Sequence, residues 1–395
     1  MIRKIIFIVS SPLYLRDYHR FGAEILINNG FEVEFFNITP YLYPVLFSNA
    51  TKKDLYIGER ERYLYNESDA LNEIKNVCKK SFVVLLINYN HDTRNIFRAI
   101  SKAGLSYAVS VLNYVPTFAS SIKNLHFFAK LKRLRVSNFR AIIINKLYSP
   151  RYGRFMGISP PDVLLMGGEM CMSHPLYSLS GPSTENLWLH TFDYDVYLQC
   201  QYSQHQTESE KAVFIDAPSP RFKFDALVPG ISSPLTEAKY YPALCAFFDC
   251  LEHVYSVDIE IAAHPKSEHD IRPEYFGKRL VHHGKTAPMI RDSKIVINRN
   301  STSVNFAVLY QKPIIFHTSD EAESSMDMSN QIKSMAFSLG KMPVNIDNFS
   351  DVDWQSEIKV DKEAYSQYKN AFIKKNGTVD TPIWQSFADW LKVHS

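Results

Sequence analysis

The hydrophobic residues of this chain fall into short apolar runs that stop abruptly at polar residues. Such runs, three to six residues long, have the length and composition of buried β-strands. They cover residues 5–9, 33–36, 82–87, 163–166, 212–215, 259–263, 294–297 and 314–316. Segments with helical periodicity lie between them, for example through Phe21, Ile25 and Leu26. Strands that alternate with helices predict an α/β protein with parallel sheets.

The most informative stretch lies between residues 258 and 318. The apolar run 294–297 ends at a polar segment, residues 298–303, and a helical pattern follows over 304–309 before the strand 314–316. This order predicts a βαβ unit, and parallel sheets bind ligands outside the carboxyl ends of their strands. Polar side chains stand at two such ends: His264, Pro265 and Lys266 after one strand, and Asn300, Ser301, Thr302 and Ser303 after another.

These residues together indicate an anion site. Hydroxyls and amides at the start of a helix favour a negatively charged group such as phosphate. His264 and Lys266 would add a hydrogen bond and a positive charge from the neighbouring strand. The alternative is that Ser301 or Ser303 is an N-cap and His264 an ordinary loop histidine, because serine is a common cap.

The motifs resemble those of a known enzyme group. AAHPKSE followed by NRNSTSVNFAVLYQKPIIF is similar to the His-Pro and Ser-Ser motif pair of bacterial CMP-sugar transferases. The segments PDVLLMGGE at 161–169 and AVFIDAP at 212–218 look most like the retaining β-Kdo transferases, and polysialyltransferases are more distant. The resemblance covers roughly residues 160–320.

The resemblance implies an architecture. It predicts two Rossmann-like domains of the GT-B type that face each other across a cleft, with C-terminal helices crossing back to the first domain. A length of 395 residues suits two domains. The expected divisions are an acceptor-side domain over 1–206 with a basic helical insertion, a nucleotide-sugar-binding domain over 207–345, and crossing helices over 346–395.

The resemblance also implies roles for individual residues. Asp216 in FIDAP would form a covalent sugar adduct, Glu169 in GGE would handle the acceptor proton, and His264 would stabilise the leaving CMP. The donor would contact Pro265, Lys266, Thr286, Asn300, Ser301, Thr302 and Ser303. From the residues alone, the alternative is that Asp216 is a turn or helix-capping aspartate. His91 and Asp92, at another strand end, either touch an acceptor or form a solvated loop pair.

Metal and cofactor chemistry finds little support in the sequence. Asp193 and Asp195 have the spacing of a metal-binding pair in an irregular context, so we expect no metal and no cofactor besides the CMP-sugar substrate. No GxGxxG and no Walker motif occurs. The five cysteines are scattered without ligand spacing, which is typical of reduced thiols.

Charge is distributed unevenly along the chain. The net charge is only +3, which does not predict nucleic-acid binding. Residues 93–161, however, contain no Asp or Glu, and 122–144 has the pattern of a basic amphipathic helix. The segment 122–154 is therefore either a contact for anionic lipid or anionic glycan, or a surface helix with extended Lys and Arg side chains. No apolar run is long enough for a membrane span, so we expect a cytoplasmic protein, peripheral on the inner membrane.

These observations lead to one main hypothesis and three alternatives. The main hypothesis is an enzyme that moves Kdo or a related nonulosonic acid from CMP to an oligosaccharide or lipid-linked acceptor of lipopolysaccharide O-antigen or capsule. The alternatives are a CDP-glycerol-type polyol-phosphate transferase, an NDP-hexose GT-B glycosyltransferase, and a non-enzymatic glycan-binding scaffold.

Overall fold

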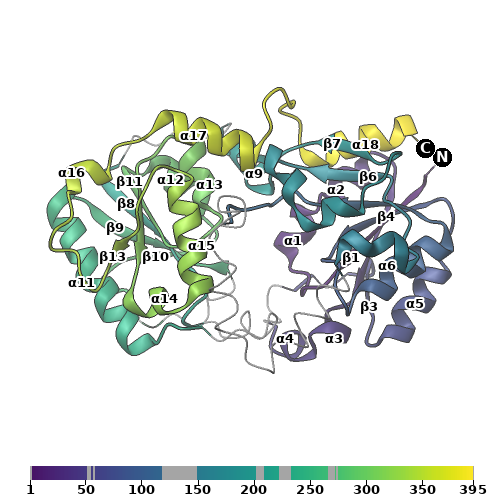
Figure 1. Cartoon of the computed structure of the whole chain (residues 1–395), viewed down its shortest axis with the longest axis horizontal. Helices are drawn as coiled ribbons and strands as arrows, with labels where there is room; N and C mark the ends of the chain where they lie inside the picture. Colours follow the sequence, from purple (N-terminus) through teal and green to yellow (C-terminus); the bar gives the residue numbers. More distant parts are fainter. Residues whose placement is uncertain are drawn as a thin grey trace. The chain divides into compact units, whose positions relative to one another are not determined.

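The computed structural model describes residues 2–50, 55–56, 58–117, 149–201, 209–221, 233–265, 272 and 275–394. The chain forms two compact units, each built around one parallel sheet (Figure 1). The first unit contains Met1–Tyr114, Asn124–Phe192 and Lys375–Ser395, and the second contains Val115–Lys123 and Asp193–Lys374.

The sheet of the first unit has the strand order β3-β2-β1-β4-β5-β6-β7. Its strands are β1 (Lys4–Val9), β2 (Glu32–Asn37), β3 (Glu61–Tyr63), β4 (Ser81–Leu86), β5 (Ser106–Ser110), β6 (Val163–Met166) and β7 (Glu185–Trp188). The α-helices are α1 (Leu15–Arg20), α2 (Ala23–Asn28), α3 (Thr39–Leu42), α4 (Pro44–Ser48), α5 (Glu67–Lys75), α6 (Arg94–Ala103) and α18 (Ile383–His394). Short 3-10 turns are η3 (Pro150–Met156), η4 (Glu169–Ser173) and η5 (Pro175–Leu179).

The second unit repeats this design with the order β10-β9-β8-β11-β12-β13. Its strands are β8 (Lys211–Ile215), β9 (Asp258–Ala262), β10 (Val281–His282), β11 (Ile295–Asn298), β12 (Ile314–Thr318) and β13 (Val344–Asn345). Its helices are α9 (Phe192–Gln201), α11 (Glu237–Tyr255), α12 (Thr286–Asp292), α13 (Val304–Leu309), α14 (Asp320–Ser324), α15 (Met326–Phe337), α16 (Trp354–Glu357), α17 (Lys362–Tyr368) and the π-helical turn η8 (Lys369–Ile373).

Each central strand is buried on both faces. In β1, Ile6 and Ile8 pack into one hydrophobic cluster, whereas Ile5, Phe7 and Val9 pack into another on the opposite face. This is the reason why the central strands are continuous apolar runs in the sequence. Each of the runs predicted as a strand forms one, and the α/β prediction is confirmed.

The last helix of the chain belongs to the first unit. In α18, Trp384 meets the ring of Phe7 edge-on at 5.1 Å between centroids, and its Nε1 donates to the carbonyl of Arg20 at 2.8 Å. Gly22, at φ +61°, makes room for it, because a Cβ there would lie 2.2 Å from the Trp384 ring. Figure 1 shows α18, in yellow, beside α2 of the same unit. The predicted return of C-terminal helices to the first domain is thereby confirmed.

The units divide the chain differently from the expected boundaries at 206 and 345. Helix α9 packs in the second unit, where Tyr194 and Tyr197 join its core and Tyr197 contacts the ring of Tyr310. The tail divides as well, since α16 and α17 belong to the second unit and α18 to the first.

Two further expectations concern the basic segment and the membrane. Residues 118–148, which carry most of the predicted basic helix, lie outside the described residues. Across the residues that are described, no helix is both long and apolar enough to cross a bilayer.

Candidate functional site

In the second unit, the strand order reverses between β8 and β11. These two strands are adjacent and parallel, with Phe214 in register with Ile297, although the chain passes through β9 and β10 between them. Ligands of open α/β sheets bind at such a switch point, outside the carboxyl ends of the strands. Asp216 directly follows β8, and Arg299 directly follows β11.

Asp216 is buried and forms an ion pair. Its carboxylate accepts from the guanidinium of Arg221 and from the backbone amide of His264, the latter at 3.2 Å. The exposed fractions of Asp216 and Arg221 are 4% and 7%. Burial raises the pKa of Asp216, while the charges of Arg221 and Arg299 and the amide of His264 oppose that rise. The structure therefore brings together two predicted site residues, Asp216 and His264.

Arg299 occupies the centre of this strand-end cluster, with 2% of its surface exposed. Its Nη2 donates to the carbonyl of Ser219 at 2.8 Å, and its Nε donates to Oδ1 of Asn300 at 3.3 Å. Its guanidinium lies over the ring of Tyr240, 5.1 Å from the centroid. We call Asp216, Arg221, Tyr240, Arg299 and His317 the Asp216 cluster.

His317, at the end of β12, completes the cluster. It is fully buried, and its Nε2 is 3.0 Å from the hydroxyl of Tyr240. Burial, and then the nearby charge of Arg299, lower the pKa of His317 to about 3. The imidazole is therefore neutral at physiological pH and works as a hydrogen-bonding group.

The polar segment after β11 forms a tight turn. The side chain of Asn298 accepts from the amide of Ser301 at 3.1 Å, and the Ser301 hydroxyl accepts from the amide of Ser303 at 3.4 Å. Ser303 is the N-cap residue of α13, without a side-chain capping bond. Thr302 is exposed at the tip of the turn. The turn thus uses several of its own amides internally, and α13 itself has only six residues.

The other predicted donor residues are spread around the same sheet edge. His264 is half-buried and Pro265 exposed directly after β9, whereas Lys266 lies outside the described residues. Thr286 begins α12 and is partly exposed. The side chain of Asn300 donates to Gln331 at 3.2 Å.

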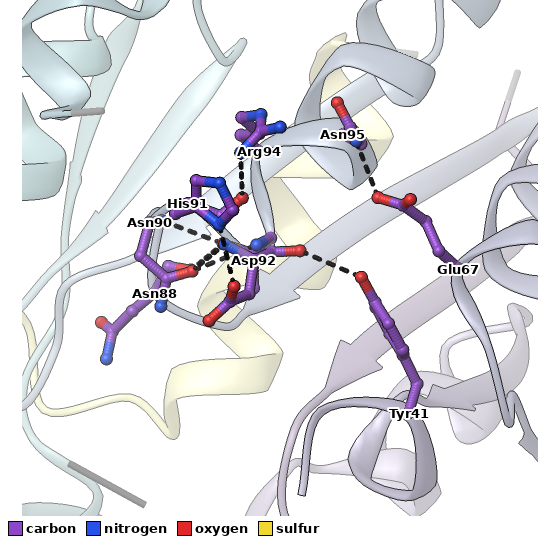
Figure 2. A network of polar contacts seen from close by, with 9 residues as sticks. Tyr41, Glu67, Asn88, Asn90, His91, Asp92, Arg94 and Asn95 are labelled. Atoms are coloured by element: carbon purple, nitrogen blue, oxygen red, sulfur yellow. Dashed lines mark hydrogen bonds and ion pairs between the residues drawn. The ribbon is translucent and has the colours of Figure 1, made fainter. Parts of the chain in front are cut away.

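The first unit has a comparable switch point between β1 and β4. Figure 2 shows the loop after β4, where the Asn90 side chain accepts from the amides of Asp92 and Thr93 at 2.9 and 3.1 Å. Tyr41 donates to the carbonyl of Asp92 at 3.4 Å. His91 Nδ1 is 3.0 Å from Oδ1 of Asp92. We call residues 88–94 the Asn90 loop.

Glu169 and Asp193 belong to neither the Asp216 cluster nor the Asn90 loop. Glu169 begins η4 after β6 in the first unit and is half-buried. Asp193, in the first turn of α9, accepts from the side-chain amide of Asn305 at 2.9 Å, as a packing contact within the second unit. Among the described residues, no group of three or more His, Cys, Asp or Glu side chains could hold a metal ion.

Sequence reasoning did not select Arg221, Tyr240, Arg299 or His317 as site residues. Arg299 and His317 each end or follow an apolar strand, so the rule that selected His264 could have found them. Arg221 carries no such signal, because it reaches Asp216 through a turn that the apolar pattern does not specify.

Two parallel sheets with both faces buried define the two-Rossmann architecture of the GT-B type. Solved structures share it. A structure of the wall teichoic acid polymerase TagF has a TM-score of 0.54 and 9% identity, covering 99% of this chain and 89% of that one. S. aureus MnaA, solved together with UDP, has a TM-score of 0.50 and 12% identity over 99% and 95% of the two chains.

A third similar structure is a putative UDP-N-acetylglucosamine 2-epimerase from Listeria monocytogenes. It has a TM-score of 0.50 and 11% identity, covering 100% of this chain and 95% of that one. No protein-family model matches the chain, and no curated protein shows significant similarity to it. At these identities the likeness concerns the fold.

Proposed function

We propose that this protein transfers Kdo or a related nonulosonic acid from its CMP-activated form to an oligosaccharide or lipid-linked glycan of lipopolysaccharide or capsule. One observation carries the proposal. The strand end with His264 and the strand end with Asp216 are joined by a hydrogen bond, at the switch point that also bears the turn 300–303. In the enzymes that the chain resembles, the His-Pro motif and the Ser-Ser turn hold CMP, and the aspartate forms the sugar adduct.

The donor chemistry fits such a site. Transfer breaks the bond between the anomeric carbon and the CMP phosphate, which leaves with the bonding electrons as an anion. Hydrogen-bond donors that are already in place stabilise such charge without a metal ion. His264 and the hydroxyls of Ser301 and Thr302 have this role in our proposal.

Asp216 would act as nucleophile in a retaining reaction. One carboxylate oxygen attacks the anomeric carbon as CMP leaves, and the acceptor hydroxyl then displaces the carboxylate while its proton passes to a base. A nucleophilic carboxylate has to be ionised, and the paired guanidinium of Arg221 favours that state. We assign the acceptor proton to Glu169.

The nucleotide is tested by thermal unfolding with CMP, CDP, UDP and GDP at matched concentrations, because a ligand that binds only the folded state stabilises it. We expect stabilisation by CMP that is lost in His264→Ala. His253→Ala, an exposed histidine on α11, is the matched control and should keep it. Stabilisation by UDP or GDP alone would overturn the CMP assignment.

The two carboxylates are tested with CMP-Kdo and intact-mass spectrometry. Glu169→Gln should accumulate a glycosyl adduct on Asp216, because the first step proceeds and the second loses its base. Asp216→Asn should form no adduct. Full turnover by a folded Asp216→Asn protein would exclude the nucleophile role.

A second candidate is a CDP-glycerol-type polyol-phosphate transferase. TagF shares the fold, and one structure of a TagF variant was soaked with CDPG. In such a transfer the attack occurs at phosphorus, so His264 stays essential and no adduct forms on Asp216. Turnover of CDP-glycerol without turnover of CMP-Kdo would favour this candidate. UDP-specific stabilisation would favour an NDP-hexose enzyme, in line with the UDP in the MnaA structure.

The basic segment 122–154 supports a further part of the proposal, contact with an anionic membrane or glycan. Sedimentation with vesicles containing anionic lipid should be weakened by the charge reversals Arg133→Glu and Arg135→Glu. If those variants abolish activity in cells while Glu169→Gln and His264→Ala leave it intact, the protein is a scaffold instead of an enzyme.

A further inference from the structure

Arg299 is a buried cation whose described hydrogen-bond partners are neutral. They are the carbonyl oxygen of Ser219, the amide oxygen of Asn300 and the side chain of Tyr240. The nearby carboxylate, Asp216, hydrogen-bonds to Arg221. Within the described part of the chain, the buried Nη1 of Arg299 has no hydrogen-bond partner. An interior charge of this kind is costly unless an opposite charge accompanies it.

Arg299 lies where a ligand of the second unit's sheet is expected to bind. It directly follows β11, one of the two strands at the switch point of the second sheet, and directly precedes the turn 300–303. Its bond to Asn300 connects the guanidinium to that turn. A planar guanidinium presents paired N–H groups, which match the oxygens of a phosphate or a carboxylate.

The neighbouring groups are arranged around the positive charge. The ring of Tyr240 lies against the guanidinium of Arg299, 5.1 Å from ring centroid to guanidinium carbon. The Tyr240 hydroxyl is hydrogen-bonded to Nε2 of His317 at 3.0 Å. The charge of Arg299 contributes to the lowered pKa of His317 and opposes the raised pKa values of Asp216 and Tyr240. His317 and Tyr240 are therefore both uncharged, so neither of them repels or neutralises the guanidinium of Arg299.

We propose that Arg299 is an anion-recognition residue of the donor site, with Nη1 binding an oxygen of the negatively charged part of the nucleotide-activated sugar. This rests on the proposed function, because it assumes a nucleotide-sugar donor. Two donor groups share the required chemistry, the phosphate of the nucleotide and the carboxylate of the nonulosonic acid.

The experiment measures binding of cytidine, CMP and CMP-Kdo to the full-length protein by calorimetry, for wild type, Arg299→Gln and Arg299→Lys. If Arg299 binds phosphate, Arg299→Gln weakens CMP at least tenfold and leaves cytidine unchanged, and Arg299→Lys falls between. If it binds the sugar carboxylate, CMP and cytidine are unchanged and CMP-Kdo alone is weakened tenfold. Either result supports anion recognition.

The matched control is Arg279→Lys. Arg279 is a largely buried arginine of the same unit that pairs with Glu252 and Asp249, away from the strand ends. It controls for disturbance caused by altering a buried guanidinium. If Arg299→Gln does not fold, Arg299→Lys decides, because it keeps the charge and loses the paired N–H groups.

The outcomes separate the two proposals. Unchanged affinities for all three ligands in the Arg299 variants would overturn the role of Arg299 while leaving the donor assignment standing. If the Arg299 variants bind cytidine and CMP more weakly by the same factor, the role of Arg299 in anion recognition is also overturned, and Arg299 is a structural residue. If the wild-type protein binds none of the three ligands, the proposed function itself fails.

Discussion

The two switch points of this molecule are built in opposite ways. In the second unit, the Asp216 cluster encloses a carboxylate, two guanidinium groups and an imidazole within the protein interior. In the first unit, the side chains of Asn90, Thr93 and Arg94 satisfy backbone amides and carbonyls of the Asn90 loop. Its ionisable pair, His91 and Asp92, is 46% and 67% exposed. At the same topological position, the second unit therefore has buried charges. The first unit has exposed charges on a loop whose backbone is held by hydrogen bonds.

The difference predicts how each site responds to change. Charges in the interior depend strongly on one another, because water does not screen them. Exposed charges are screened, and only the hydrogen bonds that hold their backbone contribute much to stability. The following experiments test this contrast, beginning with the largest expected effect.

Breaking the buried ion pair should cost the most. Arg221→Met removes the guanidinium that pairs with the buried Asp216 carboxylate, and we expect a loss of about 3–5 kcal/mol in the free energy of unfolding of the second unit. Urea denaturation measures it. The control is Arg62→Met. Arg62 is a half-exposed arginine of the first unit that pairs with Glu73 and Glu34, and Glu34 keeps its ion pair with Lys4, so this change should cost under about 1 kcal/mol. The double variant Arg221→Met/Asp216→Leu should recover much of the loss. Similar costs for Arg221→Met and Arg62→Met would contradict the contrast.

Acid should destabilise the second unit through His317. Its pKa is about 3 in the folded protein and ordinarily 6.5, so the unfolded chain binds a proton that the folded protein does not. Above pH 6.5 both states are neutral and the effect is absent. Between about pH 6.5 and 3, stability should fall by up to about 1.4 kcal/mol per pH unit from this group. Denaturation of wild type and His317→Gln across this range measures the slope, which the variant should lose. An unchanged slope would show that His317 is not the group responsible.

Removing the central amide of the Asn90 loop should have a moderate effect. Asn90→Ala deletes the acceptor of the Asp92 and Thr93 amides, and we expect a loss of about 1–2 kcal/mol. The control is Asn49→Ala, which removes an exposed side-chain donor to Val45 at 2.8 Å. Thermal denaturation compares the two. Equal, negligible shifts would mean that the loop does not depend on Asn90.

The smallest effect should come from the exposed pair itself. His91→Gln and Asp92→Asn should each change the free energy of unfolding by under about 0.5 kcal/mol, since exposed ion pairs contribute little. Repeating the denaturation at low and high salt should leave both variants close to wild type. A loss of several kcal/mol in either variant would show that the Asn90 loop also depends on its charges.

The central strands could be predicted from the sequence because burial on both faces makes them continuous apolar runs. Edge strands such as β3 and β7 were missed, since Glu61, Glu185 and Asn186 interrupt the apolar pattern where the strand is partly exposed. Strand β5 was also missed, because Ser106 and Ser110 at its ends shorten its apolar run.

The site residues that directly follow apolar strands could also be predicted, whereas those on other elements could not. His264 and Asp216 directly follow apolar strands, and the structure joins them. Arg221 and Tyr240 reach the cluster through a turn and a long helix, respectively, so their approach depends on tertiary packing that no local pattern encodes. The roles of Asp216, Glu169 and the turn 300–303 in catalysis and donor binding stay predictions.

The position of α18 has a consequence for the order of events during synthesis. Trp384, Phe387 and Leu391 fill the same cluster as Phe7 and Val33, so the earliest strands to leave the ribosome wait for some of the last residues to be made before their core is complete. The core of the second unit extends from Tyr194 to Ile373, so it spans a shorter stretch of sequence and has all its residues before α18 is made. We therefore expect the half of the molecule that is translated first to finish folding last, with its β1–β2 region exposed to chaperones for most of the elongation time.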